Sequence, residues 1–167
     1  VPTMPKPEIS DKDRLIGQYV AELVEDESTL QVGFGNIPLA VTSCLTNKKD
    51  LGVHTELFSD GLLDLYEAGA LTNRKKTIWK GKFVADCAVG TKHLYDFMDN
   101  NLAVEFQRGL VVNDPRIIGR NHRMVSINSA LEIDLTGQCC AESIGTRLWS
   151  GTGGHKEFTQ GVQYSPG

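Results

Sequence analysis

The sequence predicts an α/β domain in which helices flank an open, mostly parallel β-sheet, with short antiparallel strands in the last third of the chain. Two observations predict this fold. Between residues 29 and 98, short apolar strand candidates alternate with segments of helical periodicity, a pattern typical of βαβ units. After residue 103, shorter apolar stretches are separated by turn residues, which favours short strands and hairpins.

The beginning of the chain predicts an arm followed by a helix. Residues 1–9 include three prolines and are expected to form an extended arm or linker, and residues 10–167 then form one domain. Ser10 and Asp13 have the spacing of a helix start, where each side chain caps the backbone of the other. The helix is expected to turn one apolar face to the core, formed by Leu15, Ile16, Tyr19, Val20, Leu23 and Val24.

Three strand–turn–helix repeats follow. Their strands and helices are expected at residues 29–34 and 37–45, 52–58 and 60–69, and 83–89 and 94–98. Ser59 or Asp60 can cap the middle helix, and Gly69 can end it. In the last third, Thr136 and Gly137 predict a hairpin connection between Ile133 and Ala141.

Composition excludes several classes of protein. The chain has 167 residues, of which 40% are hydrophobic and 23% charged, so it can bury an ordinary globular core. No apolar run approaches the roughly 20 residues that cross a bilayer, so we expect no membrane partner. With a net charge of −4 and no basic block beyond residues 74–76, no nucleic-acid partner is expected either.

The cysteines predict neither a disulfide framework nor a metal site. Cys139 and Cys140 are adjacent, and Cys44 and Cys87 lie in apolar stretches, which favours a reducing, cytoplasmic location. There is no C-x-x-C and no histidine pair at helical spacing, so no metal is expected. The first residue, Val1, begins no secretory signal, and without an initiator methionine the chain is interpreted as a fragment or a processed product.

Three segments compete for the ligand crevice at the carboxyl ends of the strands. The turn at Gly33 and Gly35 could offer backbone amides to an anion or a carbonyl oxygen, but it is equally well a tight turn. Glu56 ends a strand candidate, where a carboxylate can point into the crevice or remain solvated surface. The glycine loop at 151–154 indicates close backbone approach to a ligand, or else a flexible loop or bulge.

Other polar candidates are weaker. His54 alternates with Glu56 and can share its strand face, although a histidine satisfied by a backbone carbonyl is the favoured interpretation. The sequence pattern assigns no role to His155. Cys139 and Cys140 have no neighbours that would lower a thiol pKa, so a structural role is favoured over a nucleophile.

Several separated strings resemble one family. They are Leu30–Pro38, Gly52–Gly61, Val112–Pro115, Val125–Gln138 and Ser150–Gly154, and they occur in order over nearly all of the chain after Leu30. Together they are similar to the C-terminal domain of the acetyl-CoA hydrolase/transferase family, in particular to its 4-hydroxybutyrate CoA-transferase-like members. The resemblance implies a CoA-transferase family I-like domain.

The resemblance also implies site residues. The glutamate of the H-[ST]-E-x-x-x-D-G string corresponds to Glu56, which would be the nucleophile, and Asn113 would help to hold the oxyanion. Backbone amides of the two glycine loops would bind the thioester carbonyl and the thiol end of CoA; these residues are Gly33, Phe34, Gly35 and Asn36, and Gly151, Gly153 and Gly154. His155, Lys156 and Glu157 depart from the pattern of relatives and can alter contacts to CoA or the acyl group.

The implied reaction is acyl transfer between an acyl-CoA and a small carboxylic acid such as acetate or 4-hydroxybutyrate. It would proceed by ping-pong through an acyl-glutamyl anhydride and a glutamyl-CoA thioester, with coenzyme A as substrate and no permanently bound cofactor. The alternatives are an acetyl-CoA hydrolase, a non-catalytic CoA-binding half, and a sugar-phosphate isomerase on a related scaffold. Family enzymes carry a further N-terminal domain that this chain is expected to lack, which implies a partner chain or a homo-oligomer.

Overall fold

A computed structural model describes residues 2–167 and has a central sheet of five parallel strands. Its order is β4-β3-β2-β1-β5, so the chain first adds strands on one side of β1 and then returns to the other side with β5. The strands are β1 (Thr29–Val32), β2 (Gly52–Phe58), β3 (Phe83–Ala88), β4 (Val104–Phe106) and β5 (Met124–Ile127). The expected open, parallel α/β sheet is confirmed.

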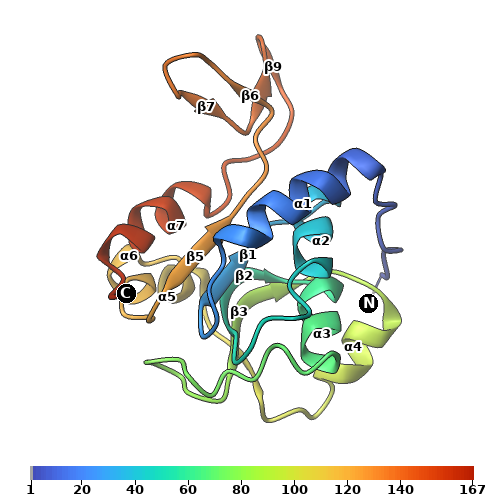
Figure 1. Ribbon diagram of the computed structural model, residues 1–167, viewed down its shortest axis with the longest axis vertical. Coiled ribbons are helices and arrows are strands. Elements are labelled where there is room, and N and C mark those ends of the chain that lie inside the picture. Colours follow the sequence, from blue (N-terminus) through green and yellow to red (C-terminus); the bar gives the residue numbers. More distant parts are fainter. Residues whose placement is uncertain (1) are drawn as a thin grey trace.

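Helices cover both faces of this sheet (Figure 1). On one side lie α1 (Asp11–Leu23), α2 (Asn36–Ser43), α3 (Asp60–Glu67) and α4 (Lys92–Met98). On the other side lie α5 (Gly109–Val112), α6 (Pro115–Ile118), α7 (His155–Gly161) and the short 3₁₀ helix η1 (Val162–Tyr164). Each face therefore has its own apolar core, and the smaller one is built around Val84, Val112, Ile118, Met124 and Phe158.

The start of α1 follows the sequence expectation, and its buried face follows it only in part. The Ser10 hydroxyl accepts from Asp13 N at 3.2 Å, and Asp13 Oδ2 accepts from Ser10 N at 3.0 Å, so the expected cap is present. Val24 is buried and Val20 packs against the core as predicted, but Leu15, Tyr19 and Leu23 are 49%, 63% and 81% exposed, so this half of the predicted inner face is wrong. The buried residues within the helix itself are the small ones, Gly17 and Ala21.

Close approach of α1 to α2 explains this difference. A Cβ at Gly17 would lie only 2.7 Å from the Ala40 carbonyl oxygen, so the two backbones nearly touch there. Gly17 and Ala21 are buried in this contact. A search for hydrophobic periodicity counts large apolar side chains and ignores glycine, and it therefore placed Leu15, Tyr19 and Leu23 on the buried face.

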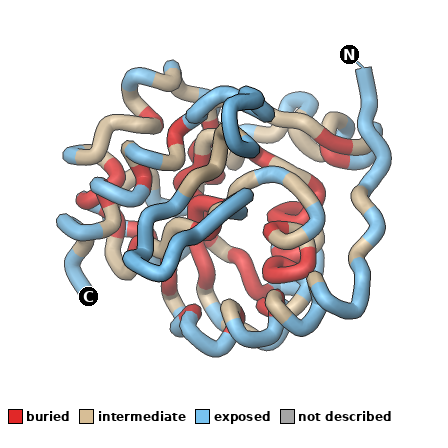
Figure 2. The backbone as a smooth tube through the Cα atoms, turned by 90° about the horizontal axis from the view of Figure 1, so that it is seen from above, coloured by how far each residue is buried: buried red, intermediate tan, exposed pale blue. Residues whose placement is uncertain are grey.

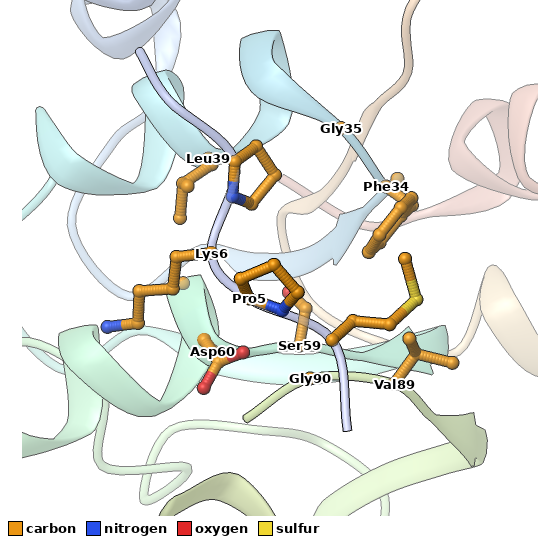
Figure 3. A pocket seen from close by; sticks show the side chains of 13 residues that line it. Pro5, Lys6, Phe34, Gly35, Leu39, Ser59, Asp60, Val89 and Gly90 are labelled. Carbon is orange, nitrogen blue, oxygen red and sulfur yellow. The ribbon is translucent and has the colours of Figure 1, made fainter. Parts of the chain in front are cut away.

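The N-terminal arm lies across the carboxyl ends of β1 and β2 (Figure 3). Met4 N donates to the Gly90 carbonyl at 2.9 Å, and Lys6 Nζ lies 2.7 Å from Asp64 Oδ1. Pro5 and Lys6 pass over a small pocket whose other walls include Phe34, Leu39 and Asp60 (Figure 3). The arm thus covers one side of the first glycine turn.

The last third contains two short antiparallel pairs that project from the body (Figure 1). They are β6 (Glu132–Ile133) with β7 (Cys139–Cys140), and β8 (Ser143–Ile144) with β9 (Arg147–Leu148). The β6–β7 turn has Gly137 at φ +87°, and Asp134 Oδ1 accepts from Thr136 N and Gln138 N, so the expected hairpin is confirmed. We call residues 131–149 the hairpin arm.

The hairpin arm is more exposed to solvent than the rest of the fold. Buried residues concentrate in the strands and the inward helix faces, whereas long stretches of the surface are exposed (Figure 2). Several apolar side chains of the hairpin arm are exposed, namely Ile133, Leu135, Ile144, Leu148 and Trp149.

Within residues 2–167, no helix combines the length and apolar character needed to span a bilayer.

Candidate active site

Glu56 lies where β2 emerges from the core. Residues 52–55 are buried between the neighbouring strands, and Glu56 is half-buried, so its carboxylate reaches the open end of the sheet. Among residues 2–167, this carboxylate has one side-chain hydrogen bond, in which Asn113 Nδ2 donates to Glu56 Oε2 over 3.2 Å. Two residues 57 positions apart in sequence are therefore in direct contact.

Asn113 is held at this position by the end of α5. It is the C-cap of that helix, and its N–H donates to the Gly109 carbonyl at 2.8 Å. Asn113 Oδ1 is buried and has no hydrogen-bond partner among residues 2–167. The amide is thus a fixed donor toward Glu56, with an acceptor that a bound group can still satisfy.

The glycine loop before α7 closes against the same pair. Gly153 has φ +50°, and a Cβ built on it would lie 3.6 Å from Glu56 Oε1. A Cβ on Gly154 would overlap Glu56 Oε2 and lie 2.7 Å from Asn113 Nδ2. Only a residue without a side chain lets the backbone approach the carboxylate this closely.

A cleft of about 480 Å³ opens beside Glu56. It lies at the carboxyl ends of β1 and β5, where the strand order reverses, which is the usual ligand position in open α/β sheets. Besides Glu56, the wall-forming residues are Gln31–Phe34, Leu57, Asn128–Leu131, Ala141 and Trp149–His155. The base of the hairpin arm therefore forms one wall.

A paired amide stiffens the floor of this cleft. Gln31 Nε2 donates to Asn128 Oδ1 at 3.0 Å, and Asn128 Nδ2 donates back to Gln31 Oε1 at 2.9 Å. Gly33 N donates to the Ile127 carbonyl at 2.8 Å, and a Cβ on Gly33 would lie 3.1 Å from Asn128 Oδ1. The first glycine turn is thereby packed tightly onto β5.

The structure divides the predicted glycine-turn residues. Gly33 and Phe34 line the cleft with Glu56, as do Gly151, Gly153 and Gly154. Gly35 faces the small pocket under the N-terminal arm (Figure 3), and Asn36 is exposed at the start of α2 and lines neither pocket. Gly33 and Phe34 lie between the two pockets and line both, because the chain turns from β1 into α2 at this point.

Asp60 secures the neighbouring loop. Its buried carboxylate accepts from Thr91 N at 3.0 Å and from Thr91 Oγ1 at 2.5 Å, which joins the start of α3 to the turn after β3. Figure 3 shows Asp60 beneath the N-terminal arm, in the pocket that Gly35 also lines. Asp60 is thus a structural cross-link beside the cleft.

Two buried basic side chains, His54 on β2 and Lys76 beside the start of β2, lie outside the cleft lining. Burial lowers the pKa of His54 to about 4, although its hydrogen bond to the Val112 carbonyl raises it. Burial also lowers the pKa of Lys76 to about 7, and its Nζ donates to the carbonyls of Val53 and Lys82 at 2.6 and 2.8 Å. Across residues 2–167, no three His, Cys, Asp or Glu side chains are grouped so that they could hold a metal ion.

Residues 90–167 match the family model described as the acetyl-CoA hydrolase/transferase C-terminal domain. The chain is 50% identical over 161 residues to the succinyl-CoA:cyclohexane-1-carboxylate CoA transferase of Geobacter metallireducens, and 48% identical over 161 residues to the 4-hydroxybutyrate coenzyme A transferase of Clostridium kluyveri. The chain belongs to the acetyl-CoA hydrolase/transferase family. The family resemblance expected from the sequence is confirmed.

The match to these relatives covers most of this chain and a minor part of theirs. It spans 96% of this chain in both cases, and 37% and 38% of the two transferases. The crystal structure of RipA from Yersinia pestis shares the fold with a TM-score of 0.94 at 36% identity, over 100% of this chain and 38% of that chain. The chain therefore spans well under half the length of the family members it matches.

Some residues of this acetyl-CoA hydrolase/transferase domain site were not singled out from the sequence. Gln31, Asn128 and Trp149 line the cleft, and Phe158 packs behind it. Asn128 and Gln31 lie within the strings that resemble the family, which was an available signal. Phe158 had none, because its importance comes only from where α7 packs.

Proposed function

We propose that this domain carries the nucleophile of an acyl-CoA:carboxylate CoA-transferase and that the nucleophile is Glu56. The observation that supports this most is the meeting of Glu56, Asn113 and Gly154, from three separate elements, beside the cleft that Glu56 and Gly154 line. A carboxylate kept close to a fixed amide and a glycine backbone suits attack on a thioester. A phosphate cradle with a general base, as in a sugar isomerase, would be favoured by lysine or arginine side chains, and the cleft lining within residues 2–167 includes neither.

The first half-reaction moves CoA onto the protein. A Glu56 oxygen attacks the thioester carbonyl carbon, the carbon–sulfur bond breaks, and CoA leaves as a thiolate from a mixed anhydride. The thiolate then attacks the glutamyl carbonyl carbon of this anhydride, and the first carboxylic acid departs as a carboxylate. Glu56 is left as a CoA thioester, so the thioester bond energy is retained.

The second half-reaction reverses these steps with another acid. The incoming carboxylate attacks the Glu56 thioester to form a new anhydride and free CoA thiolate. The thiolate attacks the acyl carbonyl of the new anhydride, which releases the acyl-CoA product and restores the Glu56 carboxylate. Water must be kept from both intermediates, since either would be hydrolysed.

Asn113 is proposed to stabilise the oxyanion of each tetrahedral intermediate. Its Nδ2 already donates to the Glu56 carboxylate at 3.2 Å, so the donor stands within reach of an oxygen that develops charge beside this carboxylate. A preorganised donor of this kind is worth roughly 2.7–4 kcal/mol in the transition state. The backbone of the loop at Gly153 and Gly154 would complete the binding of the carbonyl and the CoA thiol.

Exclusion of water calls for a cover over the open cleft. We propose that this cover is a domain equivalent to the part of the relatives that lies outside the match, since the match spans only 37% and 38% of their length. It would pack on the hairpin arm, whose base lines the cleft and whose exposed apolar residues include Leu148 and Trp149.

The test is an exchange assay with labelled acid. The chain, alone and mixed with the N-terminal part of the C. kluyveri relative, is incubated with acetyl-CoA and isotopically labelled acetate. A transferase brings the label into acetyl-CoA, and Glu56→Gln abolishes this exchange. Exchange that persists in Glu56→Gln would remove Glu56 from the mechanism.

Hydrolysis is the second candidate, because the family includes acetyl-CoA hydrolases as well as transferases. The two activities share the Glu56 thioester and differ in whether an acid or water resolves it. Release of CoA from acetyl-CoA without any added acid, with no exchange of label, would favour the hydrolase. Neither release nor exchange in the mixture would leave a CoA-binding half as the remaining interpretation.

A further inference from the structure

His54 is a buried side chain that the proposed chemistry does not use. It stands two residues before Glu56 on β2, and its side chain is fully enclosed, with 0% exposure. Its Nε2 lies 2.8 Å from the Val112 carbonyl oxygen, and because a carbonyl only accepts, Nε2 is the donor. Nδ1 is buried with no hydrogen-bond partner within residues 2–167.

The hydrogen bond of His54 acts on the residue next to Asn113. Val112 is the last residue of α5, and Asn113 follows it directly. In the described part of the chain, residues 2–167, no side-chain hydrogen bond caps this four-residue helix at its N-terminus. The imidazole therefore ties the end of α5 to the same strand that carries Glu56, so that strand positions both partners of the Glu56–Asn113 contact.

The ring of His54 also reaches the third element of the site. Its centroid lies 6.2 Å from that of Phe158 and 5.8 Å from that of Trp79. Phe158 belongs to α7, and its N–H donates to the Gly154 carbonyl at 3.0 Å. By contacting Phe158, the His54 ring helps to fix the first turn of α7 and, through it, Gly154, which lies against Glu56.

We infer that His54 is a positioning residue, which sets Asn113 and Gly154 against the Glu56 carboxylate by joining α5 and α7 to β2. This inference rests on the proposed function of Glu56. A purely apolar side chain would fill the same space without a buried nitrogen that lacks a partner, so packing alone does not explain an imidazole here. The hydrogen bond to Val112 does explain it.

The experiment compares His54→Gln, His54→Asn and His54→Leu in the exchange assay, with the chain mixed with the N-terminal part of the relative. A glutamine amide can occupy the place of Nε2 and donate to the Val112 carbonyl, whereas asparagine is too short and leucine has no donor. We expect His54→Gln to keep kcat within a few-fold. His54→Asn and His54→Leu should lower kcat about 10-fold to 100-fold with little change in KM, as expected for a displaced active-site group.

A double-mutant cycle separates positioning from general loss of structure. If His54 acts mainly through Asn113, His54→Leu should cost little further kcat in an Asn113→Ala background, because the group it positions is already gone. His93→Leu, on the exposed surface of α4 where it pairs with Glu67, serves as the matched control and should leave kcat unchanged. Thermal unfolding is measured for every variant.

The outcomes for His54 and for Glu56 are distinguishable. Exchange that survives Glu56→Gln sinks the proposed function and, with it, this inference. If exchange depends on Glu56 but His54→Leu keeps normal kcat, the positioning role is wrong. If the loss in His54→Leu multiplies fully with that of Asn113→Ala, the positioning of Asn113 is wrong. If His54→Leu fails to fold, the comparison of His54→Gln with His54→Asn takes its place. Equal kcat in these two variants would contradict a role for the hydrogen bond to Val112.

Discussion

Gly154→Ala adds one methyl group where the site has no room for it. The glycine has φ −91° and ψ 8°, which alanine adopts without strain, so the backbone should keep its course. The new Cβ would overlap Glu56 Oε2 and lie 2.7 Å from Asn113 Nδ2, whereas ordinary contact begins near 3.4 Å. Both side chains must therefore shift by several tenths of an ångström or more, and their hydrogen bond must break or turn.

The expected cost falls on catalysis more than on folding. A displacement of about 1 Å in an active site can lower turnover roughly 100-fold, which corresponds to about 3 kcal/mol of activation free energy. We expect a loss of this size in kcat for acetyl-CoA:acetate exchange. The midpoint of thermal unfolding should change little, since the displaced groups are half-buried side chains at the edge of the sheet.

Gly151→Ala is the matched control in the same loop. A Cβ at this position meets no other protein atom within 4 Å, so Gly151→Ala leaves the Glu56–Asn113 contact intact and exchange should fall much less than in Gly154→Ala. Equal activity of Gly154→Ala and Gly151→Ala would refute the packing argument. Equal loss in both would mean that the loop needs flexibility rather than close approach.

Two other predictions use the contacts behind Glu56. Asn113→Ala should lower kcat by about 10²–10³, roughly 2.7–4 kcal/mol, with a smaller change in the KM for acetyl-CoA, and a loss confined to KM would assign Asn113 to binding. Because burial lowers the pKa of His54 from 6.5 to about 4, the folded state binds fewer protons than the unfolded state between these pH values. Unfolding free energy should therefore fall by about 3 kcal/mol as pH drops through this window. The unfolding free energy is measured by urea titration at several pH values. In His54→Gln it should depend less on pH between 4 and 6.5. The same pH dependence in His54→Gln as in the unchanged protein would contradict a neutral buried imidazole.

Much of the architecture follows from local sequence patterns. β2 begins and ends where the sequence predicts, at Gly52 and Phe58, because residue types that favour strands, Val53, Thr55 and Phe58, are followed by a possible helix cap at Ser59. The helix start at Ser10 and the hairpin at Gly137 also follow, since capping and turn chemistry are local. The errors arose where packing between distant segments determines which residues are buried and which short elements form.

Three such cases stand out. The buried residues within α1 are Gly17 and Ala21, and the nearness of α2 selects them over Leu15, Tyr19 and Leu23. Helices α5 and α6 have four residues each, too few to show a helical period. β4 and β5 join the parallel sheet, although their short apolar stretches carry no signal of strand direction.

The candidate site divides in the same way. Glu56 and the glycine loop at 153–154 could be singled out from residue type and resemblance, but their contact with each other and with Asn113 exists only in three dimensions. Periodicity suggested that His54 shares the strand face of Glu56, and the structure shows its ring nitrogen on the Val112 carbonyl. Its link to Phe158 on α7 depends on a helix packing that no local pattern encodes.

Trapping the acyl intermediate tests the central claim most directly. The chain and the N-terminal part of the relative are mixed with acetyl-CoA, quenched with hydroxylamine, digested and analysed by peptide mass spectrometry. An activated glutamyl carbonyl should be converted to a hydroxamate at Glu56, in amounts that depend on acetyl-CoA and vanish in Glu56→Gln. Active exchange with an unmodified Glu56, or with the hydroxamate on another residue, would contradict the account.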